Sequence, residues 1–139
     1  MLATAPAPQA SDWRLNISVV FTSVEATMAA LRRAAQMAAQ LGARITIVVP
    51  QVVPLPLPLS SPPVLLDFSE RRFHTIASKS PVETSVRLYL CRDERETLGN
   101  VLAPRSLIVV GSRRRWWPTH EKRLARWLRK RGHEVVVTE

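Results

Sequence analysis

Apolar residues along the chain gather in five short runs, and longer amphipathic stretches with helical periodicity separate these runs. Short β-branched runs predict buried strands, whereas the longer periodic stretches predict helices. Strands are expected at 17–21, 44–50, 82–91, 106–111 and 134–138, and helices at 22–42, 67–80, 93–104 and 119–132. This alternation predicts a single α/β domain whose five-stranded, mostly parallel sheet carries helices on both faces.

Capping residues mark the ends of the first and last predicted helices. Thr22 and Glu25 fit a capping box, and Gly42 stands where a left-handed C-cap is expected. Thr119 and Gly132 occupy the corresponding positions around the last helix. The chain between these caps is therefore expected to be helical.

Three predicted strands end at Thr22, Pro50 and Gly111. In open parallel sheets, ligands bind beyond the carboxyl ends of the strands. Pro50 is expected to end its strand, because proline lacks the N–H that a strand ladder needs. It opens a proline-rich loop at 50–63 that fits either a segment packed on the domain or a ligand for an SH3-type module.

The length of 139 residues suits one domain with a sizeable core. Residues 1–14 lack a periodic apolar pattern and are expected to form a disordered tail, which leaves 15–139 as the domain. The sequence shows no signal-peptide pattern and no apolar run of about 18 residues, so a cytoplasmic protein without a transmembrane segment is expected. Cys91, the only cysteine, is expected to be a small buried side chain.

Positive charge is concentrated near one end of the chain. The formal net charge is +9, and nine lysines and arginines between positions 113 and 131 face a single acid, Glu121. Such clustering favours weak, sequence-independent binding to nucleic acid or an anionic surface, although a solvated helix face gives the same pattern.

The order of elements, and the segment SLIVVGSR before a last helix and a valine-rich strand, resemble the universal stress protein family over residues 15–138. The resemblance implies a Rossmann-like sheet of order 3-2-1-4-5 and a role in the stress response. It also implies an ATP site formed by an aspartate after the first strand and a G-x2-G-x9-G-[ST] loop after the fourth.

The chain departs from that nucleotide-binding pattern at each of its main positions. Thr22 stands at the aspartate position, and the loop begins at Gly111 but has Arg114 at its second glycine. The third glycine falls on Leu124 or, counted back from the last strand, near Glu121 and Lys122. A phosphate cradle needs glycines so that successive N–H groups can face one anion. A regulatory or interaction module that has lost ATP binding, and has no cofactor, is therefore predicted.

An anion-binding module is the alternative, with the forked guanidinium groups of the arginine loop holding a nucleotide, another phosphorylated ligand or nucleic acid. The candidate binding residues are Thr22, Ser23, Val49, Pro50, Gly111, Ser112, Arg113, Arg114 and Arg115. Of the adjacent Trp116 and Trp117, one is expected to pack inside and one to face solvent or a partner.

The sequence contains no Walker loop, zinc-ligand spacing or Ser-His-Asp constellation. His74, His120 and His133 lie far apart among polar neighbours and are expected at the surface. A protein without catalytic residues or a metal site is therefore predicted.

The last valine-rich segment, EVVVT, becomes an edge strand in the order 3-2-1-4-5. An edge without proline, a bulge signal or an inward-pointing charge is open to pairing with another chain. A homodimer through Val135, Val136 and Val137 is therefore predicted, as in many universal stress proteins, with Val136→Pro as the disrupting substitution.

Overall fold

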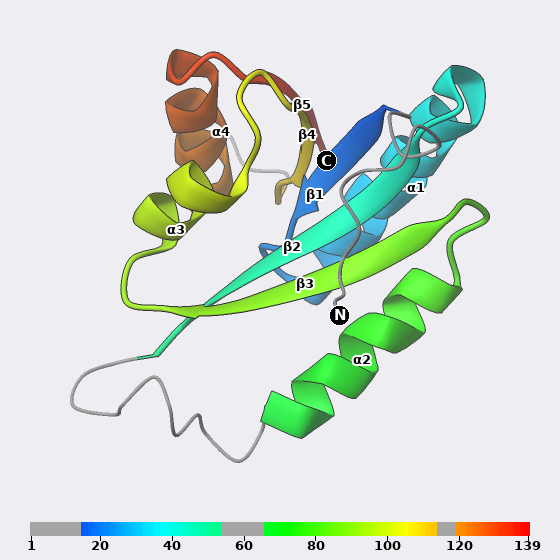
Figure 1. Cartoon of the computed structure of the whole chain (residues 1–139), viewed down its shortest axis with the longest axis horizontal. Coiled ribbons are helices and arrows are strands. Elements are labelled where there is room, and N and C mark those ends of the chain that lie inside the picture. Colours follow the sequence, from blue (N-terminus) through cyan, green and yellow to red (C-terminus); the bar gives the residue numbers. More distant parts are fainter. Residues whose placement is uncertain (1–14, 54–65, 114–118) are drawn as a thin grey trace, which may run out of the picture.

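The computed structural model describes residues 15–53, 66–113 and 119–139. The five strands β1 (Asn16–Val20), β2 (Arg44–Val52), β3 (Thr84–Cys91), β4 (Leu107–Gly111) and β5 (Glu134–Thr138) form one parallel sheet of order β3-β2-β1-β4-β5. The four helices are α1 (Val24–Leu41), α2 (Leu66–Ser78), α3 (Glu94–Val101) and α4 (His120–Lys130). The predicted fold class and strand order are confirmed (Figure 1).

Each face of the sheet has its own hydrophobic core. Ile17 and Val19 of β1 pack with α1 and α2, and Val20 packs with α3 and α4 on the other face. The centre of the sheet is covered on both sides, which explains its nearly continuous apolar strands. The helices therefore form two layers, with α1 and α2 on one face and α3 and α4 on the other (Figure 1).

Pro50 lies inside β2, so the prediction that it ends the strand was wrong. The N–H of Phe21 donates to the carbonyl of Val48, which shows that even-numbered residues of β2 face β1. β1 ends at Val20, so the nitrogen of Pro50 points past the end of that neighbour. The proline therefore removes no hydrogen bond between β2 and β3, and Pro50 still pairs in register with Tyr89. The remainder of the predicted loop, from residue 54, and the predicted tail at 1–14 lie outside the described residues.

The first helix is capped by Ser23, not by Thr22 as predicted. The Ser23 hydroxyl accepts a hydrogen bond from the N–H of Ala26 at 3.3 Å. Thr22 instead donates its hydroxyl proton to the carbonyl of Gly111, 3.0 Å away. Gly42 has a φ of 66° and forms the predicted left-handed C-cap.

β5 is an edge strand, and its register decides which of its backbone groups face outward. The N–H of Glu134 donates to the carbonyl of Ser106, and the carbonyl of Thr138 accepts from the N–H of Ser112. The backbone groups of even-numbered residues of β5 therefore bond to β4. The N–H and C=O groups of odd-numbered residues point outward from the edge of the sheet. The predicted homodimer through this edge stays a prediction.

Candidate functional site

The carboxyl ends of β1 and β4 meet beside the first turns of α1 and α4, and a cavity of about 680 Å³ opens there. It is lined by Ser23, Val24, Glu25, Ala26, Ala29, Ser112, Arg113 and Glu139. This volume is in the usual range of small-ligand sites. Glu25 and Glu139 were not predicted as site residues, and both bring negative charge to its wall.

The predicted site residues divide into two groups. Ser23, Ser112 and Arg113 line this cavity, and the bond from Thr22 to Gly111 ties the two strand ends together behind it. The predicted residues Val49 and Pro50 line a second cavity of about 360 Å³, together with Phe21, Val24, Gln51, Val52, Arg72 and Phe73. Arg114 and Arg115, like Trp116 and Trp117, lie outside the described residues.

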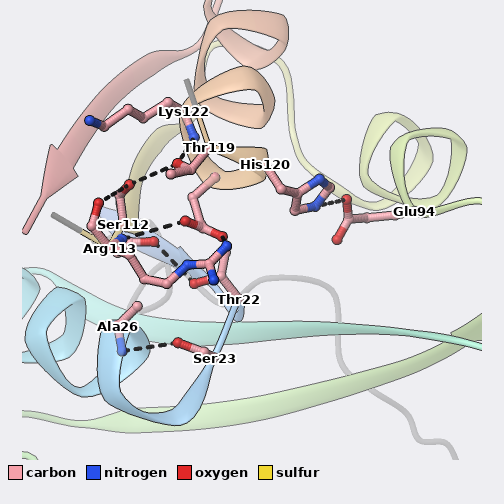
Figure 2. A network of polar contacts seen from close by, with 11 residues as sticks. Thr22, Ser23, Ala26, Glu94, Ser112, Arg113, Thr119, His120 and Lys122 are labelled. Carbon is pink, nitrogen blue, oxygen red and sulfur yellow. Dashed lines mark hydrogen bonds and ion pairs between the residues drawn. The ribbon is translucent and has the colours of Figure 1, made fainter. Parts of the chain in front are cut away.

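A buried carboxylate occupies the N-terminal turn of α4, directly opposite the loop after β4. Glu121 is 6% exposed, and its Oε2 accepts a hydrogen bond from the backbone N–H of Arg113 at 3.4 Å. Its Oε1 accepts one from the guanidinium of Arg113, also at 3.4 Å. Figure 2 shows Arg113 beside the end of β4, with Thr22 on one side and Thr119 on the other. The carboxylate of Glu121, in the first turn of α4, is thus held by two donors of Arg113.

The pKa of Glu121 reflects this environment. Burial alone raises the pKa of its carboxyl, but the hydrogen bonds from the Arg113 N–H, the Thr119 hydroxyl and the Arg113 guanidinium outweigh burial and lower the pKa below its ordinary value of 4.5. Glu121 is therefore ionised at neutral pH and neutralises Arg113.

Two buried hydroxyls support the same turn. Thr119 is the predicted N-cap of α4, and its hydroxyl oxygen accepts from the N–H of Lys122 at 3.3 Å. The hydroxyls of Thr119 and Ser112 lie 3.2 Å apart and are hydrogen-bonded. Ser112 is 4% exposed, and its hydroxyl helps to hold this turn through the bond to Thr119.

Glu121 was not predicted as a site residue, although the sequence carried a signal. It is the only acid in a strongly basic segment, and it stands two residues after the predicted cap Thr119. An acid at that position lies in the first helical turn, where the helix dipole favours negative charge. Nothing in the sequence, however, showed that its partner would be Arg113, because that contact depends on how β4 and α4 pack.

The three histidines have different surroundings, and His74 is exposed as predicted. The Nε2 atom of His120 lies 3.0 Å from Oε1 of Glu94 (Figure 2). This contact links the first turns of α3 and α4. His133 is 9% exposed, so the prediction of a surface histidine was wrong for this residue. Its Nδ1 accepts a hydrogen bond from the N–H of Ser106, because the turn after α4 folds back onto the loop before β4. Within the described ranges, no cluster of His, Cys, Asp or Glu could hold a metal ion.

Three solved structures that align with this chain are universal stress proteins. One, from Archaeoglobus fulgidus, aligns with a TM-score of 0.62 at 18% identity over 90% of this chain and 98% of its own. A family member from Burkholderia pseudomallei aligns with a TM-score of 0.58 at 19% identity over 90% and 96% of the two chains. A universal stress protein in complex with cAMP aligns with a TM-score of 0.58 at 16% identity over 90% and 97%.

The chain therefore has the universal stress protein-like fold that the sequence resemblance implied. No protein-family model and no curated protein matches its sequence. In the described part of the chain, none of the helices has the length and apolar character that crossing a membrane requires.

Proposed function

We propose that this chain is a non-catalytic regulatory or interaction module of universal stress protein-like fold, in which its own Glu121 carboxylate takes the place of bound phosphate. The main support for this proposal is that the backbone N–H and the guanidinium of Arg113 both donate hydrogen bonds to Glu121. The first residue of the arginine loop is thus already engaged with an internal anion.

Electrostatics support the loss of ATP binding. A phosphate at this loop would have to displace the Glu121 carboxylate from Arg113. The phosphate and the carboxylate would then lie close together, and two negative charges at close range repel each other. Glu25 on the cavity wall adds to this repulsion. Thr22, at the position of the family's aspartate, uses its hydroxyl for the bond to Gly111.

Helix α4 begins at His120, which favours the alignment that places the missing last glycine near Glu121. The resemblance puts phosphate contacts at this turn, and here a carboxylate is present instead. The absence of catalysis is proposed on the same grounds, because the described hydroxyls at the cavity are engaged in capping and in tying the strand ends.

The competing function is an anion-binding module that uses Arg113, Arg114 and Arg115. One structural neighbour was solved in complex with cAMP, so cyclic nucleotides belong in the test beside ATP. Thermal unfolding of the purified protein is measured with millimolar Mg-ATP, cAMP or inorganic phosphate. A ligand at about a hundred times its Kd stabilises by about 2.7 kcal/mol, which raises the Tm by several degrees for a chain of this size.

The expected result is no ligand-dependent shift for the wild-type protein. Glu121→Gln removes the internal anion and releases the Arg113 guanidinium, so this variant should gain stabilisation by phosphate or ATP. Glu94→Gln is the matched control, because Glu94 also contacts the first turn of α4 but not Arg113. A shift of several degrees for the wild-type protein with ATP or cAMP would instead establish the anion-binding function.

A further inference from the structure

The outer side of β5 presents backbone groups that another strand can bond. Val135 and Val137 point their N–H and C=O groups away from β4. Among the described residues, the guanidinium of Arg129 provides the one hydrogen bond to this outer row, donating to the carbonyl of Val135 at 2.9 Å. Both backbone groups of Val137 and the N–H of Val135 face outward beside it. Arg129 therefore shields one end of the edge and leaves the rest accessible.

A cationic groove runs along this edge on the α4 side of the sheet. A cavity of about 370 Å³ lies there, lined by Lys122, Arg126, Arg129, Val137 and Glu139. Arg126 is exposed, and Lys122 lies 3.4 Å from the carboxylate of Glu139. Three cations thus face one acid. We name these five residues the β5 edge groove.

We propose that the β5 edge groove binds an extended acidic segment of a partner protein, which joins the sheet as a sixth strand. The backbone of the segment would pair with the N–H of Val135 and with both backbone groups of Val137, and every second side chain would point toward α4. Carboxylates at those positions reach Arg126 and Lys122. The inference rests on the proposed role as an interaction module and names the surface through which it acts.

Charge favours an acidic strand over a second copy of this chain. Antiparallel pairing of two β5 strands about a twofold axis places both α4 helices side by side on one face of the joined sheet. The basic residues of the β5 edge groove would then face their own counterparts, and like charges across an interface are unfavourable. An acidic strand offers the same backbone bonds and neutralises the groove.

The test uses a fluorescein-labelled octapeptide of alternating glutamate and valine, with an alternating lysine and valine octapeptide and octathymidylate as comparison probes. Anisotropy at physiological salt should show binding of the acidic peptide alone. Arg126→Glu should weaken this binding by about tenfold or more, and Val137→Pro should abolish it because proline lacks the donor. Hydrogen exchange at the Val137 amide should slow when the acidic peptide binds.

Arg33→Glu is the matched control, because Arg33 is an exposed arginine on α1, on the other face of the sheet, and the substitution changes the net charge equally. It should leave the affinity unchanged. Equal weakening by Arg33→Glu, equal binding of octathymidylate, or no binding of the acidic peptide at about 1 mM would each overturn the proposal. So would light scattering that shows a dimer from which the peptide is excluded. These variants leave Glu121 intact, so this proposal and the nucleotide experiment can fail independently.

Discussion

Gly111 lies so close to the first turn of α1 that a Cβ atom built on it would come within 1.9 Å of the carbonyl oxygen of Ala26. The resemblance to universal stress proteins makes Gly111 the first glycine of a phosphate loop. In this chain it has a packing role, because the end of β4 and the backbone of α1 touch there. The adjacent bond from Thr22 to the Gly111 carbonyl holds the same junction.

Gly111→Ala is therefore expected to destabilise the protein by about 1–3 kcal/mol or more, since backbone must move to admit the methyl group. Urea unfolding measures the loss. Gly99→Ala is the control, because its added Cβ would lie 3.2 Å from the flexible end of Arg131 and would improve helix propensity. Equal effects of the two substitutions would show that the α1 contact does not restrict position 111.

Stability is expected to fall as the pH drops below about 6.5 because of His133. Burial, and secondly the positive charge of Arg131, lower the pKa of His133 below its ordinary value of 6.5. The unfolded chain then binds a proton that the folded protein does not, so stability is full above that value and is lost as the pH falls toward the lowered folded pKa. Protonation also removes the Nδ1 acceptor for the Ser106 N–H.

The measurement compares urea unfolding at pH 7.5 and pH 5.5 for the wild-type protein and His133→Asn, whose amide oxygen can still accept from Ser106. The variant should lose less stability over this interval. Glu121 does not contribute here, because its lowered pKa affects stability only below about 4.5. The same loss in both proteins would assign the pH dependence to other groups.

The fold could be predicted from the sequence because its signals are local and repeated. Alternating apolar runs and helical stretches indicate strand and helix wherever several residues agree, and the structure confirms the predicted caps Gly42 and Thr119. Pro50 was misjudged because its tolerance depends on where the neighbouring strand ends. That is a property of register between β1 and β2, which no single run of residues encodes.

The site could be predicted only in outline. The residues at the strand ends were found by topology, and Ser23, Ser112 and Arg113 do line one cavity. The pairing of Arg113 with Glu121 was missed because both charged residues had generic interpretations, one as a phosphate ligand and one as a helix-end acid. Their contact requires the loop after β4 and the first turn of α4 to meet at a particular distance.

The register of β5 predicts opposite outcomes for two neighbouring proline substitutions. The N–H of Val136 faces β4, so Val136→Pro removes a ladder donor inside the sheet and leaves a β4 carbonyl without its partner, at a cost of about 1–3 kcal/mol. The N–H of Val137 faces outward, so Val137→Pro spares the ladder and should cost distinctly less. Val136→Pro is therefore the wrong substitution with which to test pairing at the outer edge, and Val137→Pro is the right one. Val136 and Val137 are both partly buried, so the two variants lose similar amounts of apolar packing and differ mainly in the hydrogen bond. Urea unfolding at one pH decides the order, and a larger loss for Val137→Pro would show that the odd-numbered residues of β5, not the even-numbered ones, bond to β4.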